Sequence, residues 1–184
     1  TIGGDDTNGA AKRLYEREGI PVIGFPKTID NDLRTKTMHY YQGKATEAVL
    51  CPGFPSAATR VSEMTRHLRS TNESHERIMV VEVMGRDAGW LTGSAIFGGA
   101  ELALVPEYEI TAERKERFFE VIKKRYQEKK NLIIAVSEGV RWWDDNTKQL
   151  SMVYASSETD EYGHPRFGGV SGVIASEISN KLGI

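Results

Sequence analysis

Short apolar runs alternate along the chain with longer stretches rich in helix-favouring residues. Four of the runs are rich in β-branched residues and barely alternate with polar positions, which is typical of strands buried on both faces of a parallel sheet. They cover residues 22–23, 78–84, 102–105 and 132–136. The sequence therefore predicts a strand at each run, the first of them extending to residue 25.

Four segments between these runs have helical composition, at residues 6–18, 57–68, 111–130 and 167–182. The third is the clearest, because Phe118, Ile122 and Tyr126 recur every four residues among Lys, Arg and Glu. Strands that alternate with helices imply an α/β fold whose parallel sheet has right-handed crossovers. The sequence shows neither a helical nor a strand period at residues 33–44 and 140–166, so we expect irregular structure there. The second of these segments has room for a hairpin.

Composition and charge narrow the classes of partner. The chain has 184 residues, of which 39% are hydrophobic and 27% charged, as in ordinary globular domains. Its 24 basic and 26 acidic side chains give a net charge of -2, so no basic excess points to nucleic acid. The apolar runs fall short of the ~18 residues of a membrane helix. Cys51 is the only cysteine, which excludes an internal disulfide and favours a cytoplasmic location.

The two ends of the sequence look like interrupted elements. Thr1 and Ile2 resemble the last step of a strand, and residues 181–184 resemble a helix stop with more chain to follow. We interpret the sequence as an internal excerpt of a longer chain, truncated at both ends.

A glycine pair followed by two aspartates opens the chain, at residues 3–7. Without Cβ atoms, Gly3 and Gly4 let the backbone approach a phosphate group, and the following helix offers free N–H groups. Asp5 could hold Mg²⁺, which takes one or two carboxylates together with phosphate oxygens and water. The alternative is that Asp5 or Asp6 merely caps the helix.

A second acidic segment, residues 26–32, follows the strand expected at residues 22–25. Asp30 and Asp32 lie two positions apart, so both can face one way from an extended turn. One carboxylate could take a proton from a hydroxyl group while the other lies near a metal ion. The alternative is an ordinary polar turn in which the aspartates bond to their own backbone.

Five short segments, taken in order, resemble motifs of the 6-phosphofructokinase family. They are GGDDT at residues 3–7, PKTIDND at 26–32, SHER at 74–77, VEVMGR at 81–86 and SEG at 137–139. The resemblance implies a three-layer, Rossmann-like parallel sheet of the phosphofructokinase type. It also implies a donor-binding domain to which residues 1–42 belong and a sugar-phosphate-binding domain in residues 43–184.

The resemblance further implies transfer of a phosphoryl group to the 1-hydroxyl of fructose 6-phosphate, with Mg²⁺ as cofactor and a homodimer or homotetramer as assembly. Asp30 resembles the general base that acts on this hydroxyl, and Thr28 and Asp32 resemble the groups beside it. Asp5, and with it Asp32, resembles the Mg²⁺-binding carboxylates. Gly4 resembles the glycine beside the phosphoryl donor.

The remaining motifs resemble the sugar-phosphate side of the family's site. Met84, Gly85 and Arg86 match its sugar-phosphate segment, with Arg86 near the transferring phosphoryl group. Glu138 resembles the carboxylate that binds sugar hydroxyls, and Arg77 resembles an arginine that reaches the substrate of a neighbouring subunit. The alternatives are surface salt bridges for the two arginines and a solvated strand-end carboxylate for Glu138.

Asp6 and Lys27 bear on the phosphoryl donor. ATP-using members of the family usually have glycine at the position of Asp6, which leaves room for an α-phosphate. A carboxylate there adds bulk and negative charge, whereas Lys27 adds a cation that could hold pyrophosphate. Both features resemble the pyrophosphate-dependent branch. The alternatives are an ATP-dependent enzyme and, in another class, a non-catalytic regulatory or binding subunit with the same fold.

Overall fold

The computed structural model describes residues 1–41, 44–48, 50–152, 154–159 and 165–183. The chain forms two compact units, Thr1–Ala57 and Ala58–Ile184. The functional division expected near residue 42 remains a prediction. Among the described residues, every helix is too short or too polar to cross a lipid bilayer.

The first unit holds one helix and two small sheets. Its elements in chain order are β1 (Ile2–Gly3), α1 (Asp5–Glu18), β2 (Phe25–Pro26), β3 (Arg34–Tyr41) and β4 (Lys44–Ala48). β1 and β2 pair in parallel. The strand predicted over residues 22–25 is wrong, because only Phe25 belongs to β2 and the Ile23 side chain is 88% exposed. The pairing joins Ile2 to Phe25 and Gly3 to Pro26.

The irregular structure predicted for residues 33–44 is also wrong. β3 and β4 form an antiparallel pair in which Tyr40 lies opposite Ala45 and Tyr41 opposite Lys44. The segment mixes strand-favouring Thr and Tyr with charged residues, so it has strand propensity without an apolar period. A search for hydrophobic runs therefore misses it.

The second unit contains a parallel sheet. Its elements are the greater part of α2 (Phe54–His75), then β5 (Ile78–Val83), α3 (Trp90–Ser94), the short helix η1 (Ala95–Gly98), β6 (Leu102–Leu104), α4 (Ala112–Lys129), β7 (Leu132–Ser137), β8 (Trp142–Asp144), β9 (Gln149–Ser151), β10 (Tyr154–Thr159), β11 (Pro165–Phe167) and α5 (Val170–Leu182). The strand order is β5-β7-β6 and both pairings are parallel, which confirms the predicted α/β class.

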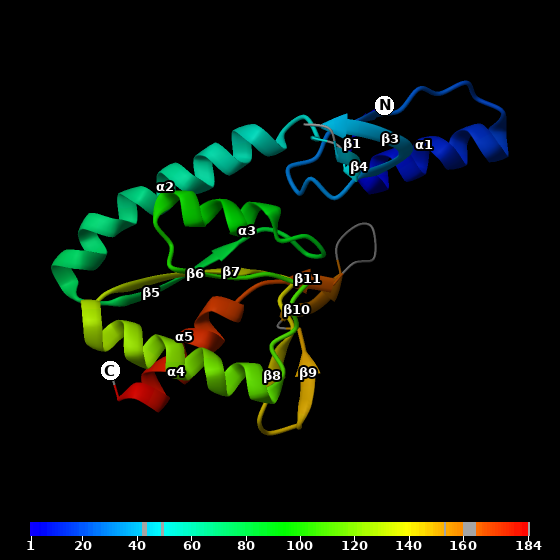
Figure 1. The fold of residues 1–184 in the computed structure, drawn as a ribbon. Coiled ribbons are helices and arrows are strands. Elements are labelled where there is room, and N and C mark those ends of the chain that lie inside the picture. The colour runs from blue at the N-terminus through cyan, green and yellow to red at the C-terminus, as the bar shows by residue number, and fades with distance from the viewer. Residues whose placement is uncertain (42–43, 49, 153, 160–164, 184) are drawn as a thin grey trace. The chain divides into compact units, whose positions relative to one another are not determined.

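The core of this unit lies around β7, all six residues of which are buried. Leu132, Ile134 and Val136 join a buried cluster with Ile122 of α4 and Ile174 of α5. Alternate residues of a strand face opposite sides, so the residues between them point to the face on which α3 packs. The sheet is therefore the middle of three layers, with α3 on one face and α4 and α5 on the other (Figure 1).

A hairpin follows β7, in the segment where the sequence left room for one. β8 and β9 pair antiparallel, and the Trp142 side chain is buried. The Lys115 ammonium, on a side chain only 3% exposed, contacts Asp145 Oδ2 at 2.8 Å and Glu177 Oε2 at 2.7 Å. It also donates to the carbonyl oxygen of Trp143, so one cation joins α4, the hairpin and α5. The sequence analysis did not find this cluster.

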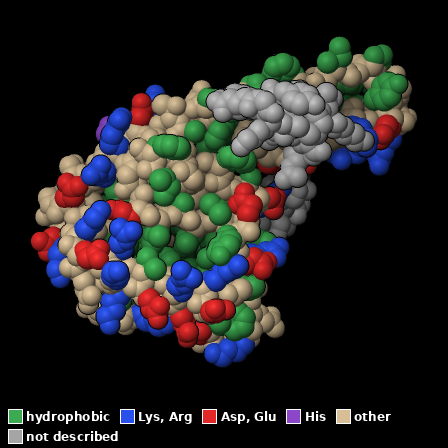
Figure 2. All heavy atoms as spheres, in the orientation of Figure 1, with side chains coloured by type: hydrophobic (Ala, Val, Ile, Leu, Met, Phe, Trp, Pro, Cys, Tyr) green, Lys and Arg blue, Asp and Glu red, His purple; other side chains and the backbone are tan. Residues whose placement is uncertain are grey.

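Charged side chains of both signs are interspersed on the face of the molecule drawn in Figure 2. This mixture matches the nearly balanced count of 24 basic and 26 acidic residues. It favours partners recognised at a local site over partners attracted by a field of one sign.

Candidate functional site

The first acidic segment lies where β1 passes into α1. Gly4 occupies the N-cap position of α1, and Asp5 and Asp6 lie in the first helical turn. Neither aspartate is therefore the capping residue, so the alternative that Asp5 or Asp6 merely caps the helix does not hold. Both carboxylates lie at the positive end of the helix dipole, where negative charge is stabilised.

The second acidic segment is held in place by backbone groups of residues 51–52. The Thr28 N–H donates to the Pro52 carbonyl at 3.1 Å, and the Cys51 N–H donates to Asn31 Oδ1 at 2.9 Å. Within the segment, the Asp30 N–H donates to Thr28 Oγ1 at 3.1 Å. This last bond closes a turn through the Thr28 hydroxyl, whereas the structural alternative expected the aspartate side chains to make the turn. The same turn fixes the backbone of Asp30 relative to Thr28, as a positioned base would require.

The two acidic segments lie side by side, as the motif order predicts for strand ends in one sheet. The Lys27 N–H donates to the Gly3 carbonyl at 2.8 Å, which continues the pairing of β1 with β2. A Cβ atom on Gly4 would lie 3.9 Å from the Thr28 Cβ. Glycines at positions 3 and 4 therefore lie directly against the segment that carries Lys27, Thr28 and Asp30.

Asn8 is a positioning residue that the sequence analysis missed. Its side-chain amide donates to the carbonyl oxygens of Gly3 at 2.7 Å and Gly4 at 2.9 Å. A Cβ atom on Gly24 would overlap its amide oxygen, so Asn8 is enclosed between the glycine pair and the entry to β2. An asparagine inside a predicted helix, one turn after a glycine pair, was the available signal, because asparagine disfavours helix interiors.

The sugar-phosphate motifs meet at the carboxyl ends of β5 and β7 in the second unit. The Glu138 N–H donates to the Val83 carbonyl at 3.0 Å and the Gly139 N–H to the Gly85 carbonyl at 3.2 Å. The Gly85 N–H in turn donates to Glu138 Oε1 at 3.3 Å. The structure thus brings together Met84, Gly85 and Glu138, and the Met84 side chain is 58% exposed beside them.

Arg86 points outward from the same edge of the sheet. Its Nε atom contacts Asp87 Oδ2 at 2.8 Å, so the surface salt bridge of the alternative interpretation does form. Arg86 and Gly139 line a cavity of about 380 Å³, which is also lined by Arg114 and Arg141. Three carboxylates line it as well, so this cavity is polar and close to charge balance.

Arg77 lies at the opposite end of β5. Its carbonyl accepts the Leu132 N–H at 3.0 Å, where β5 and β7 begin. A strand rises about 3.3 Å per residue, so roughly 20 Å separate Arg77 from Met84. The structure therefore does not bring Arg77 to the edge that carries Arg86 and Glu138 of the same chain.

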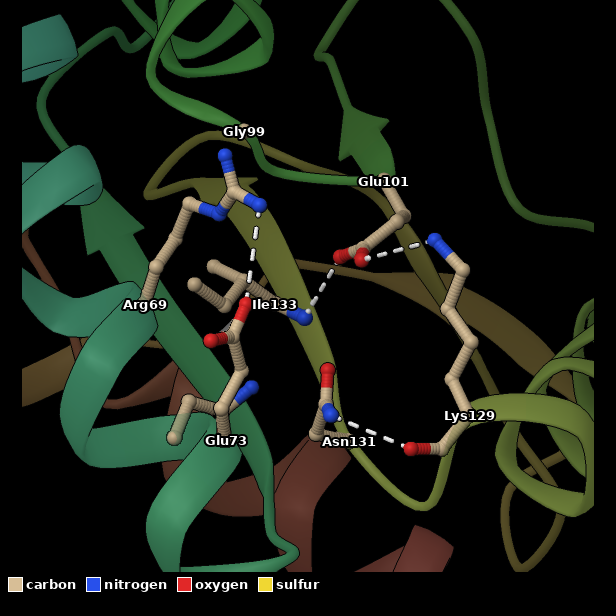
Figure 3. Close-up of a pocket in the computed structure, with 8 residues that line it drawn as sticks. Arg69, Glu73, Gly99, Glu101, Lys129, Asn131 and Ile133 are labelled. Carbon is tan, nitrogen blue, oxygen red and sulfur yellow. Dashed lines mark hydrogen bonds and ion pairs between the residues drawn. The ribbon is translucent and has the colours of Figure 1, made fainter.

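A further polar cavity of about 270 Å³ lies at the amino ends of the strands (Figure 3). Its charged groups are paired with one another: Arg69 with Glu73 at 3.5 Å, and Lys129 with Glu101 at 3.8 Å. Glu101 also accepts the Ile133 N–H at 2.8 Å, near the start of β7. This cavity is thus separated from the Met84 and Glu138 edge by the length of the sheet.

Asp5 and Asp32 are the carboxylates predicted to hold Mg²⁺. The described residues contain no cluster of three or more His, Cys, Asp or Glu side chains that could hold a metal. Mg²⁺ does not need such a cluster, because it is usually held by one or two carboxylates together with substrate phosphates and water. The exposed side chains of Asp5 and Asp32 are hard oxygen donors and fit this mode.

Comparisons with known proteins agree on one family. The family model described as Phosphofructokinase matches residues 1–184. A pyrophosphate–fructose 6-phosphate 1-phosphotransferase of Streptomyces coelicolor is 38% identical over 184 residues, which cover 100% of this chain and 48% of that protein. A protein of the same name from Amycolatopsis methanolica is 40% identical over 183 residues, 99% of this chain and 48% of its own length. The chain thus spans about half the length of these curated relatives.

The fold of the chain also resembles that of a solved structure. The pyrophosphate-dependent phosphofructokinase from Nitrosospira multiformis matches with a TM-score of 0.71 and 26% identity, over 100% of this chain and 41% of that one. This likeness confirms the phosphofructokinase-type fold that the motifs implied. An ATP-dependent 6-phosphofructokinase of Streptomyces coelicolor is 35% identical over 188 residues, 99% of this chain and 48% of its own length.

Proposed function

Because the chain belongs to the phosphofructokinase family, we propose that the protein transfers a phosphoryl group reversibly from pyrophosphate to the 1-hydroxyl of fructose 6-phosphate, with Mg²⁺ as cofactor. The observation that carries the donor assignment is the pair Asp6 and Lys27, one at the start of α1 and the other beside Gly3. Relatives named for pyrophosphate at 38–40% identity support it.

On the donor side, Gly4 and Lys27 would receive pyrophosphate. The glycine lets phosphate oxygens approach the first N–H groups of α1, and the lysine ammonium offers a positive charge. Asp5 and Asp32 would hold Mg²⁺, which neutralises charge on the phosphoryl oxygens when bound. Asp6 fills the space and repels the charge of an α-phosphate, which disfavours ATP.

On the acceptor side, Asp30 would take the proton of the sugar hydroxyl as it attacks phosphorus. The turn closed by the Asp30 N–H and Thr28 Oγ1 holds the two residues at a fixed spacing. Thr28 and Asp32 would orient the reacting groups around this base. Positioning of this kind is the main contribution a protein makes to phosphoryl transfer.

Met84, Gly85 and Glu138 would bind the sugar. Arg86 would stabilise charge on the transferring phosphoryl group. Its exposed pairing with Asp87 is worth only about 0–1 kcal/mol, so a phosphoryl group could displace the aspartate at little cost. The Arg86 cation lies at the edge of the sheet where the sugar would bind.

Arg77 would serve the substrate of a neighbouring subunit, which makes the protein a homodimer or homotetramer. Its place at the amino end of β5, roughly 20 Å from Met84, supports this assignment. Cys51, which is buried and is the only cysteine of the chain, is in keeping with a reducing cytoplasm.

Two alternatives remain open to experiment. ATP as the donor is favoured by the relative named as ATP-dependent at 35% identity. A non-catalytic subunit is disfavoured, because a scaffold has no need of Asp5, Asp30 and Arg86 together. An assay of the full chain with fructose 6-phosphate, and with pyrophosphate and ATP supplied separately, distinguishes all three. Turnover with pyrophosphate is expected; turnover with ATP alone, or with neither donor, would overturn the proposal.

A further inference from the structure

The loop that carries Arg86 is held from both sides by residues outside the motif roles assigned above. It joins β5 to α3 through residues 84–89. At its start, the Gly85 carbonyl accepts a hydrogen bond from the hydroxyl group of Ser137. The Ser137 side chain is fully buried at the end of β7, so water does not compete for this bond.

The other end of the loop is held by Glu107, which follows β6. Its Oε1 atom accepts the Gly89 N–H at 2.9 Å. A Cβ atom on Gly89 would lie 2.9 Å from the Glu107 Oε2 atom and would overlap Val105, so backbone and carboxylate are in close contact. The loop is therefore fastened at its start to the end of β7, through Ser137, and at its other end to the segment after β6, through Glu107.

Between these two points the loop folds tightly on itself. Gly85 has a φ of +143°, and a Cβ atom there would lie 2.5 Å from the Ala88 carbonyl oxygen. Arg86 and Asp87 are left at the apex, with 41% and 71% of their side chains exposed. The two ends of the loop thus place the backbone from which the Arg86 side chain projects.

We propose that Ser137 and Glu107 are positioning residues that together fix the loop of residues 84–89, and so hold Arg86 against the transferring phosphoryl group. The inference rests on the proposed function, which gives Arg86 its task. Neither residue touches the reacting atoms in this scheme. Each acts through the backbone of the loop, at Gly85 or at Gly89.

Two measurements on the full chain test the proposal, applied to Ser137→Ala and Glu107→Ala. The first is amide hydrogen exchange of the peptide that spans residues 84–89, which should quicken by roughly tenfold when one hydrogen bond is lost. The second is steady-state turnover with fructose 6-phosphate and pyrophosphate. We expect kcat to fall roughly tenfold with little change in KM, since Arg86 acts in the transition state.

The controls separate positioning from general damage. Ser94→Ala removes another buried hydroxyl that donates to a carbonyl, that of Leu91, and should leave exchange at residues 84–89 and kcat unchanged. Glu107→Gln keeps an oxygen acceptor for Gly89 and should restore most of what Glu107→Ala loses. In an Arg86→Ala background, Ser137→Ala should lower kcat no further, because the group that it positions is gone.

The outcomes distinguish this proposal from the proposed function. The positioning roles would be overturned if hydrogen exchange at residues 84–89 were unchanged in both alanine variants. They would also be overturned if each variant lowered kcat by the same factor with and without Arg86→Ala. Wild-type protein without turnover would overturn the proposed function instead. The hydrogen-exchange result would still show whether Ser137 and Glu107 hold the loop.

Discussion

The carbonyl oxygen of Arg86 packs against Gly139 so closely that a Cβ atom at position 139 would overlap it. The Gly139 N–H also donates to the Gly85 carbonyl at 3.2 Å. The segments after β5 and β7 therefore meet backbone to backbone, and the absence of a side chain at position 139 sets their spacing.

Gly139→Ala should push the two segments apart. We expect a loss of about 1–3 kcal/mol in the free energy of unfolding, as for other overpacked positions. Even at temperatures where the variant is fully folded, its turnover should be lower than that of the wild type. The reason is that a shift of the Arg86 carbonyl moves the rest of Arg86 with it. Denaturant unfolding and kcat measured on the same samples check both effects.

Gly172→Ala provides the matched control. Gly172 lies in α5, and a Cβ atom there meets nothing within 4 Å. Alanine in a helix interior is favoured over glycine by roughly 0.5–1 kcal/mol, so this variant should gain stability and keep its turnover. Equal behaviour of the two variants would contradict the packing argument.

The cluster around Lys115 predicts a pH dependence of stability. Its hydrogen bond to Asp145 lowers the pKa of that carboxyl group. Burial lowers the pKa of Lys115, but hydrogen bonds to Asp145 and Glu177 outweigh it and raise the pKa above its ordinary value. A lowered carboxyl pKa stabilises the fold above the unfolded pKa of about 3.9, and this contribution is lost as the pH falls through the lowered value.

Asp145→Asn should therefore flatten the loss of stability below about pH 4 and leave the dependence at neutral pH almost unchanged. The raised pKa of Lys115 keeps the cation charged throughout this range; its own contribution is lost only as the pH rises above about 10.4. Unfolding free energies between pH 2 and pH 7, on the order of ten points, measure the effect. The control is Glu120→Gln, which changes an exposed carboxylate of α4, the helix that carries Lys115. An identical flattening in this variant would exclude the Lys115 contact as the cause.

The strands of the parallel sheet could be predicted because burial on both faces leaves an unbroken apolar run, as at residues 132–136 of β7. The positions of Gly4 and Glu138 directly after β1 and β7 could be predicted too, since short motifs carry them. The contacts of Ser137 and Glu107 could not, because they depend on the spatial order β5-β7-β6, which the chain order does not reveal.

The first unit shows a second reason for failure. The polar strands β3 and β4 pair through backbone groups, and their sequence carries no apolar period that marks the pairing. Asn8 holds Gly3 and Gly4 through a side-chain amide, a contact specified by geometry and not by residue pattern. Hydrophobic periodicity marks apolar faces along a sequence, and neither feature is carried by such a pattern.

A shared active site predicts complementation between inactive variants. Asp30→Ser should cut turnover by roughly 10²–10⁴, the usual contribution of a general base. Arg77→Ala should weaken binding of fructose 6-phosphate at the neighbouring subunit. Mixed oligomers would contain sites with an intact Asp30 from one subunit and an intact Arg77 from the other, so part of the activity should return.

The measurement is turnover of the refolded mixture, with hybrid oligomers verified by native mass spectrometry. Each variant refolded alone is the control and should stay inactive or weak. Hybrids that form without any gain in activity would remove Arg77 from a neighbour's site.

The phosphoryl donor is tested by Asp6→Gly and Lys27→Gly. Removing the Asp6 carboxylate opens space for an α-phosphate and relieves a repulsion of ~1–4 kcal/mol in partly solvated surroundings, so kcat/KM for ATP should rise at least roughly tenfold. Lys27→Gly alone should mainly weaken pyrophosphate, because a cation is lost without new room for a nucleoside. The double variant should shift preference further than either change alone and not additively, because both residues face one donor.

The measurement is kcat/KM for both donors in the wild type, both single variants and the double variant. Glu16→Gly is the matched control, because it removes an exposed carboxylate and adds a glycine in the same helix, α1, away from the glycine pair. Its donor ratio should equal that of the wild type. If the wild type already prefers ATP, or if a folded Asp6→Gly protein keeps the wild-type ratio, then Asp6 does not select the donor. The charge at Asp6 and the cation of Lys27 would then no longer support pyrophosphate as the donor, and ATP would become the better assignment.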